Sequence, residues 1–308
     1  LVPKRNLTKN NLPFPYGNNE PKDTVFANVD YSKLTAAVNN AFDSKGQKKK
    51  RSRAVLVIYK DHIIAEKYDT GFTKNSKILG WSMTKSITAT LFGILQKQGK
   101  YDINKPAPIP EWQKDERKKI TTNDLLHMNS GLEWEEAYDK ICDATKMLFI
   151  AEDMGRVQLE KPAAFAPNTH WNYSSGTSNL LSYILRKQFK THQEYLDFWY
   201  AQLIDRIGMH SMLIETDMVG NYVGSSYGWA TARDWAKFGL LYLHKGNWNG
   251  DQVFDPSWEN YVSTPTNDSK EGYGAHFWLN AGGHFPAAPR DMYSCNGYQG
   301  QKVFIIPS

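Results

Sequence analysis

The chain has 308 residues, of which 41% are hydrophobic and 13% aromatic. This apolar content can offset the conformational entropy of a folded chain, which excludes a disordered or fibrous protein. No apolar run approaches the roughly 20 residues that a membrane-spanning helix needs, so we expect no membrane span. The formal charge is +5, from 37 basic and 32 acidic residues.

One basic stretch accounts for the excess positive charge. No basic helix with interleaved aromatic residues and no phosphate-binding glycine loop accompanies it, so we expect no nucleic-acid partner. The favoured interpretation is a solvated loop. Its six basic residues are Lys45, Lys48, Lys49, Lys50, Arg51 and Arg53.

The chain before residue 70 predicts an arm, a helix and a hairpin. Segment 1–30 is rich in Asn, Pro, Lys and Gly, which is typical of an extended arm. Asp30 is placed to cap a helix with an apolar face that should pack on a sheet. The β-branched and aromatic runs 54–59 and 62–68 flank two turn residues and predict a β-hairpin.

Helical patterns dominate residues 82–206, with loops at 105–110 and 159–168. Strand-like runs return at 273–279 and 302–306, and a periodic helix at 232–244 precedes them. This order predicts a sheet-containing domain, 1–80 and 207–308, interrupted by an all-helical domain, 81–206. We expect the active site in the cleft where the two domains meet.

Ser82 and Lys85 open a helical pattern and lie one turn apart on the same face. A serine hydroxyl becomes a good nucleophile when a base takes its proton, and a lysine of lowered pKa can be that base. The start of a helix also favours negative charge on an attacked carbonyl group. A Ser-x-x-Lys pair alone is weak evidence, because a chain of this length can carry one by chance.

Two later motifs strengthen this pair. Tyr173-Ser174-Ser175-Gly176 lies between helical patterns, and Gly297-Tyr298-Gln299-Gly300 leads into an apolar strand. The order and spacing resemble the serine β-lactamase and penicillin-binding-protein superfamily, in its class C β-lactamase-like branch. Segments 120–132 and 232–239 are also similar to family segments, and the chain is most like the 6-aminohexanoate-dimer hydrolases and esterases.

This resemblance covers about residues 54–307 and implies a fold and a set of roles. The fold would be α+β, of the β-lactamase/transpeptidase type, with an antiparallel sheet flanked by helices and an inserted helical domain. Ser82 would be the acylated nucleophile and Lys85 its base. Tyr173 would relay the proton of the leaving group, with Lys85 stabilising its anion or sharing its proton.

The resemblance also implies an oxyanion hole formed by the backbone N–H groups of Ser82 and Tyr298. Gly297 and Gly300 would allow backbone and substrate to approach closely. The chain departs from the family at Cys295, where a Lys or His is usual. A neutral thiol cannot hold a substrate carboxylate, which disfavours β-lactam recognition.

Segment 131–138 is similar to loops of the 6-aminohexanoate-dimer hydrolases, so we expect several of its residues near the cleft. A core or rim position is the alternative for Trp134, Tyr138 and His276. The expected substrate-binding residues are Ser175, Trp134, Tyr138, His276, Cys295, Asn296 and Gly297.

We therefore expect a serine hydrolase that cleaves a small ester or amide through an acyl-enzyme. The alternatives are a β-lactamase or D-Ala-D-Ala peptidase, and a penicillin-receptor-like or ligand-binding protein without turnover. We expect no metal and no cofactor, because no His-Glu-x-x-His pair and no Cys/His cluster is present.

The two cysteines and the chain ends lead to three further expectations. Because many relatives are exported, we expect a periplasmic or secreted protein whose leader has been removed, since the chain starts at Leu1. Such a compartment would allow a bridge between Cys142 and Cys295, and two separate buried thiols are the alternative. Family members usually continue past the strand that ends at Pro307, so we expect the natural chain to extend beyond Ser308.

Overall fold

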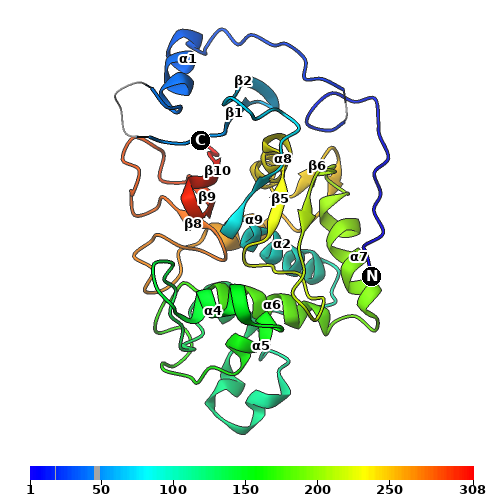
Figure 1. Cartoon of the computed structure of the whole chain (residues 1–308), viewed down its shortest axis with the longest axis vertical. Helices are drawn as coiled ribbons and strands as arrows, with labels where there is room; N and C mark the ends of the chain where they lie inside the picture. Colours follow the sequence, from blue (N-terminus) through cyan, green and yellow to red (C-terminus); the bar gives the residue numbers. More distant parts are fainter. Residues whose placement is uncertain (18, 45–48) are drawn as a thin grey trace.

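The computed structural model describes residues 1–17, 19–44 and 49–308. Lys45 and Lys48 of the expected basic loop lie outside these residues. Figure 1 shows the N-terminal arm starting beside α7 (His192–Trp199), near the middle of the molecule, and running along its upper part to α1 (Tyr31–Asn40). Arg5 anchors the arm through an ion pair of 2.7 Å with Asp205.

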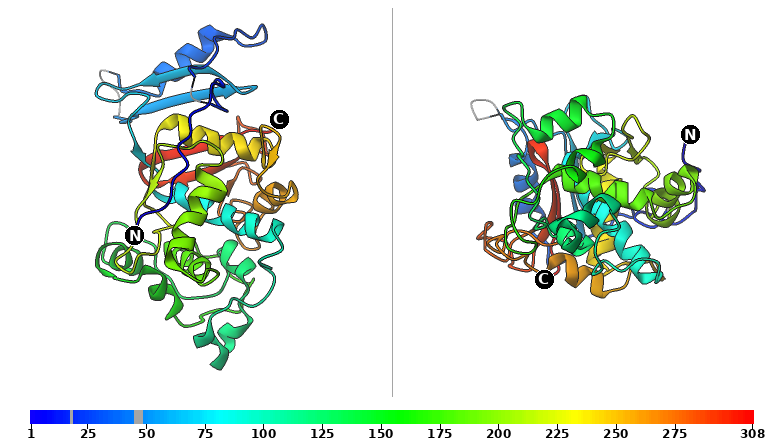
Figure 2. Two further views of the ribbon diagram at one scale, coloured as in Figure 1. Left: turned by 90° about the vertical axis from the view of Figure 1, so that its right-hand side faces the viewer. Right: turned by 90° about the horizontal axis from the view of Figure 1, so that it is seen from below.

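Helix α1 and the first hairpin form one end of the molecule (Figure 2). Asp30 caps α1 as predicted, because its side chain accepts a hydrogen bond from the backbone N–H of Lys33. Strands β1 (Ala54–Tyr59) and β2 (His62–Tyr68) pair antiparallel with the predicted bounds. The hairpin prediction is therefore confirmed.

Within the described residues, the remaining strands form three small antiparallel sheets. The predicted strand 273–279 is much shorter in the structure, because the backbone of His276 has φ +61° and cannot continue an extended strand. The sheets are β3-β5-β4 (Ile78–Leu79, Gly228–Ala230, Leu213–Ile214), β10-β9-β8 (Gln301–Ile305, Tyr293–Gly297, Trp278–Leu279) and β6-β7 (Asn247–Trp248, Asp251–Gln252).

Helices make up most of the chain between Trp81 and Ile204, as predicted. The helix that begins at Ala232 also starts where the periodicity places it. The α-helices not yet named are α2 (Thr84–Lys97), α3 (Thr122–Leu126), α4 (Asp143–Ile150), α5 (Met154–Leu159), α6 (Ser175–Arg186), α8 (Ala232–Leu243) and α9 (Ser257–Ser263). The shorter turns are η1 (Trp81–Met83), η2 (Pro110–Lys114), η3 (Glu116–Lys119), η4 (Tyr200–Ile204) and η5 (Tyr298–Gly300).

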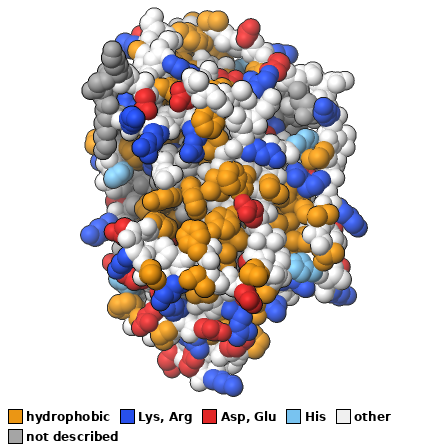
Figure 3. All heavy atoms as spheres, in the orientation of Figure 1, with side chains coloured by type: hydrophobic (Ala, Val, Ile, Leu, Met, Phe, Trp, Pro, Cys, Tyr) orange, Lys and Arg blue, Asp and Glu red, His pale blue; other side chains and the backbone are white. Residues whose placement is uncertain are grey.

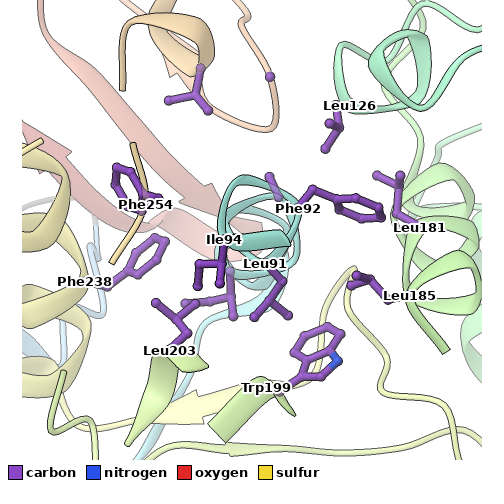
Figure 4. Close-up of a cluster of buried hydrophobic side chains, with 14 of the residues drawn as sticks. Leu91, Phe92, Ile94, Leu126, Leu181, Leu185, Trp199, Leu203, Phe238 and Phe254 are labelled. Atoms are coloured by element: carbon purple, nitrogen blue, oxygen red, sulfur yellow. The ribbon is translucent and has the colours of Figure 1, made fainter. Parts of the chain in front are cut away.

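Helix α2 runs through the centre of the core and is buried from Thr84 to Leu95. Figure 4 shows Phe92 of α2 directed toward the leucines of α6, while Phe238 of α8 and Phe254 lie on the opposite side. One continuous hydrophobic cluster therefore joins the sheets to the helical region. The division into domains 1–80 plus 207–308 and 81–206 stays a prediction.

Candidate active site

Ser82 lies in the short turn η1, which connects β3 to α2. The preceding residue, Trp81, has φ +47°, a left-handed conformation that residues with a side chain rarely adopt. The N–H of Gly80 donates to the carbonyl of Gly228 at 2.8 Å and holds this turn against β5. The N–H of Ser82 lies in the first turn of η1, where N–H groups have no acceptor within the helix.

Lys85 is fully enclosed, with 1% of its surface exposed. Its Nζ lies 3.0 Å from Ser82 Oγ, 2.9 Å from Ser175 Oγ and 2.9 Å from the backbone oxygen of Ser225. Burial lowers the pKa of Lys85 to about 8, although the negative charge of Glu136 opposes this shift. Lys85 can therefore lose its proton at mildly alkaline pH and accept the proton of Ser82.

Tyr173 completes the group of predicted catalytic side chains. Its ring lies 5.1 Å from Lys85 Nζ and packs on the rings of Trp278 and Tyr273 at 5.3 and 5.8 Å. Burial raises the pKa of Tyr173 well above its ordinary value, and only a hydrogen bond with the Ser82 side chain opposes the rise. A free phenolate is thus disfavoured, and the shared-proton arrangement is the better description of this phenol.

Glu136 is a functional candidate that the sequence analysis missed. It accepts hydrogen bonds from four donors: Trp134 Nε1–H, the hydroxyl of Tyr138, and both the N–H and the hydroxyl of Ser175. Ser225 was missed as well, because it contributes only a backbone oxygen. Three glutamates occupy segment 133–136, and nothing in their pattern distinguishes the one that points inward.

These contacts fix the direction of the hydrogen bonds around Lys85. The hydroxyl of Ser175 donates its single hydrogen to Glu136, so its oxygen can only accept from Lys85, and the oxygen of Ser225 is also an acceptor. A neutral Lys85 has two N–H groups and one lone pair. Because the two N–H groups meet these acceptors, the lone pair faces Ser82, as a general base requires.

Strand β9 brings Tyr298 beside Ser82. A Cβ atom on Gly297 would come within 2.0 Å of the carbonyl oxygen of Gly80, so only glycine allows this approach. Gly300 differs, because it adopts φ +82° in the turn to β10 and a Cβ atom there would meet no other atom. The geometry is compatible with an oxyanion hole at Ser82 and Tyr298, which stays a prediction.

A pocket of about 550 Å³ adjoins Ser82. Figure 3 shows hydrophobic side chains gathered across the middle of the face seen in Figure 1. The pocket is large enough for a small-molecule substrate. The predicted residues in its wall are Ser82, Tyr138, Tyr173, Asn296, Gly297 and Tyr298.

His276 was expected at the cleft, but it is buried and does not line the pocket. Its Nδ1 lies 2.6 Å from the backbone oxygen of Leu126, and its Nε2 lies 2.9 Å from Ser178 Oγ. Burial lowers the pKa of His276 to about 3, so the ring is neutral. It therefore donates to Leu126 and accepts from Ser178, which connects α3 to α6.

Trp134, Ser175 and Cys295 also lie behind the pocket surface rather than in it. Trp134 and Ser175 donate hydrogen bonds to Glu136, and Ser175 also contacts Lys85. Cys295 points into the core because side chains alternate along β9, whereas its neighbours Ser294 and Asn296 line the pocket. The structure thus places Cys295 behind the pocket wall, and its expected role in substrate binding stays a prediction.

The two cysteines are free and lie in different hydrophobic clusters. Cys142 packs in the cluster of Trp134 and Met147, whereas Cys295 belongs to the main core. The alternative of two separate buried thiols therefore describes this structure. Among the described residues, no group of three His, Cys, Asp or Glu side chains could hold a metal ion, and no helix is long and apolar enough to cross a membrane.

Comparison with known structures gives the same fold at low sequence identity. A protein of Bacillus anthracis described as a 6-aminohexanoate-dimer hydrolase is 20% identical, with a TM-score of 0.73 over 89% of this chain and 73% of that chain. A penicillin-binding-protein homologue of Caulobacter crescentus is 14% identical, with a TM-score of 0.69 over 93% and 91%. A family VIII carboxylesterase is 16% identical, with a TM-score of 0.59 over 76% and 75%.

No curated protein matched the chain. The comparison of the sequence with protein-family models, however, agrees with these structural likenesses. The family model described as Beta-lactamase matches residues 38–308, which is most of the chain. The predicted resemblance and the α+β fold with antiparallel sheets are confirmed. The chain therefore belongs to the beta-lactamase family and has its serine hydrolase fold.

Proposed function

We propose that this protein hydrolyses small esters or amides through an acyl-enzyme on Ser82. One observation carries the proposal: Ser82 Oγ lies 3.0 Å from the buried amine of Lys85, whose other two partners are acceptors. This arrangement supports proton transfer from the serine to the lysine. The membership of the beta-lactamase family supports the same reaction class.

Acylation begins when the neutral amine of Lys85 accepts the hydroxyl proton of Ser82. The serine oxygen attacks the carbonyl carbon, and the N–H groups of Ser82 and Tyr298 stabilise the resulting oxyanion. Tyr173 then gives its phenolic proton to the leaving oxygen or nitrogen and receives the proton that Lys85 had accepted. The C–O or C–N bond breaks, the alcohol or amine departs, and the acyl group stays on Ser82.

Deacylation repeats these steps with water as the nucleophile. Lys85 and Tyr173 take a proton from the attacking water, and the oxyanion again lies against the two N–H groups. When the bond between the acyl carbon and Ser82 breaks, the serine oxygen regains a proton. The products are a carboxylic acid and the free enzyme.

A β-lactamase or D-Ala-D-Ala peptidase is the second candidate function. The structural likeness to a penicillin-binding-protein homologue favours it. The neutral state of Cys295 argues against it, because burial raises the pKa of this thiol to about 12 and the position offers no cation for a β-lactam carboxylate. A binding protein without turnover is disfavoured by the complete set of Ser82, Lys85 and Tyr173.

The test compares purified protein on 4-nitrophenyl butyrate, short-chain 4-nitroanilides and nitrocefin. We expect kcat/KM for the ester to exceed that for nitrocefin by about tenfold or more, since a lost charge-assisted contact weakens binding by this order. Faster turnover of nitrocefin would reverse the proposed substrate class. A single stoichiometric burst with every substrate would instead identify a penicillin-receptor-like protein.

A further inference from the structure

One side of the pocket is lined by basic side chains. Lys270, His284 and Lys302, which we call the basic side, all contribute to its wall. Within residues 1–17, 19–44 and 49–308, no Asp or Glu lines this pocket. A cleft whose walls are mostly apolar and whose charges have one sign concentrates the electric field for ligands of the opposite sign.

Lys302 is placed in this wall by the pairing of β10 with β9. It stands opposite Asn296 in the antiparallel register, so the two side chains project from the same face of the sheet, and both line the pocket. Its Nζ lies 5.6 Å from the ring of Phe285 and 5.5 Å from the ring of Phe304. Both distances are within the range of a cation–π interaction.

Lys302 has no carboxylate partner among the ion pairs of the described chain. Burial lowers its pKa, and no neighbouring charge opposes this shift. The carboxylate of the catalytic region, Glu136, is occupied by its four donors and does not line the pocket. The side chain of Lys302 is nonetheless exposed, so its ammonium group can meet an anionic ligand in the pocket.

A second polar group beside Lys302 also lacks a partner. The side-chain oxygen Oδ1 of Asn296 is buried and has no hydrogen-bond partner in the part of the chain that the structure describes. Since Asn296 lines the same wall, a ligand here can meet an ammonium group and an amide together. The amide gives a donor to an anion through its nitrogen and an acceptor to a bound hydroxyl or amide group through its oxygen.

We propose that the basic side of the pocket binds an anionic group of the substrate, with Lys302 as the principal partner. The substrate class is then a small ester or amide that carries a carboxylate away from the bond that is cleaved. This inference rests on the proposed hydrolase function. The cation comes from β10 and the neighbouring loop, and not from the β9 position that Cys295 occupies.

The experiment uses two pairs of esters, each matched except for one end group that is a carboxylate in one member and a neutral group in the other. In the first pair, mono-4-nitrophenyl adipate and 4-nitrophenyl hexanoate, the charge is on the acyl side. In the second pair, 4-acetoxybenzoate and 4-acetoxybenzamide, it is on the leaving group. At about 20 mM salt we expect the anionic member of at least one pair to have a kcat/KM about tenfold higher, and about 500 mM salt should reduce this ratio.

Variants of Lys302 assign the preference to this side chain. In Lys302→Gln the ratio of anionic to neutral kcat/KM should fall to about one, whereas Lys302→Arg should keep the preference because it keeps the charge. The matched control is Lys100→Gln, an exposed lysine beyond α2 that does not line the pocket. The control should keep the ratio of the unmodified protein, and thermal unfolding checks that each variant folds.

The outcomes separate this inference from the proposed function. Hydrolysis of the neutral and anionic esters at equal rates would overturn the anion site and leave the hydrolase intact. A preference that persists in Lys302→Gln would overturn the assignment to Lys302. If no ester is hydrolysed, the proposed function itself fails.

Discussion

The two walls of the pocket differ in how their polar side chains are held. Behind the wall near α2 and α6, Lys85 and Ser175 are buried, and Lys85 Nζ makes three hydrogen bonds to neighbouring groups. On the basic side, Lys270, His284 and Lys302 are exposed. Catalytic side chains must be held in position before the substrate arrives, whereas side chains that select the substrate can be exposed and gain their partner when the substrate binds.

The difference has an energetic basis. Removing Lys85 from water is unfavourable, and its hydrogen bonds to Ser82, Ser175 and Ser225 offset that cost while fixing its orientation. Lys302 makes its close contacts with aromatic rings, which restrain the charged end less. Substitutions on the first wall should therefore change kcat, and substitutions on the second should change the preference among substrates.

The largest effect is expected for Ser82→Ala, which removes the nucleophile. Ester hydrolysis should fall by roughly 10⁴-fold or more, because no acyl-enzyme can form. Mass spectrometry after treatment with a fluorophosphonate should find one adduct, on the peptide that contains Ser82. The control Ser32→Ala changes an exposed serine on α1 and should retain the adduct and the activity. An adduct that persists in Ser82→Ala would refute the assignment.

Loss of either proton-transfer group should have a smaller but still large effect. Lys85→Ala and Tyr173→Phe should each lower kcat by roughly a hundredfold or more, which is the usual contribution of general acid–base catalysis. Tyr173→Phe is the cleaner variant, because it retains the ring that packs on Trp278 and Tyr273. Near-normal kcat in either variant would remove that residue from the mechanism.

The sequence predicted elements well where the signal was local. Strands β1 and β2 have two apolar runs around a two-residue turn, and Lys60 and Asp61 adopt the positive φ values that such a turn requires. The run 273–279 also alternates like a strand, but His276 breaks it to reach Leu126 and Ser178. The positive φ of His276 depends on contacts with segments far away in the sequence, and the local hydrophobic pattern carries no information about such contacts.

The candidate site was predicted in a similarly uneven way. The structure brings Ser82, Lys85 and Tyr173 together, and the order of their motifs was sufficient to select them. The inward position of Cys295 depends on the register of β9 against its neighbours, which a lone sequence does not give. Glu136 shares its segment with other glutamates, so only the folded chain distinguishes it.

Glu136→Gln tests whether the hydrogen-bond directions around Lys85 matter. The base must be neutral, so kcat/KM should rise with pH through the Lys85 pKa of about 8 and then level off. Glu136 raises the pKa of Lys85, so its neutralisation should shift this rise to lower pH. The plateau should fall by roughly tenfold, because an amide cannot accept both hydrogen bonds of Ser175 as well as a carboxylate does.

The control for this experiment is Glu135→Gln. Glu135 is exposed, and its side chain pairs with Lys140 at the surface, so the pH profile should not change. A purely structural role for Glu136 would lower the plateau without moving the pH at which activity rises. An unmoved profile in Glu136→Gln would therefore contradict the role of its charge at Lys85.

The smallest effect is expected from reducing agents, because the two cysteines lie behind different parts of the site and are both free. A bridge that closed so long a loop would contribute about 4 to 5 kcal/mol in the chain-entropy model, and its reduction would lower the melting temperature by several degrees. We expect dithiothreitol to change neither the melting temperature nor the activity.

Thiol titration gives an independent check. In the denatured, unreduced protein it should find two thiols. In the folded protein the thiols should react slowly, since burial raises the pKa of Cys295 to about 12 and both side chains are enclosed. A titration that finds no thiol would require the loop of Cys142 to reach β9, and with it a different arrangement of Glu136 behind Lys85.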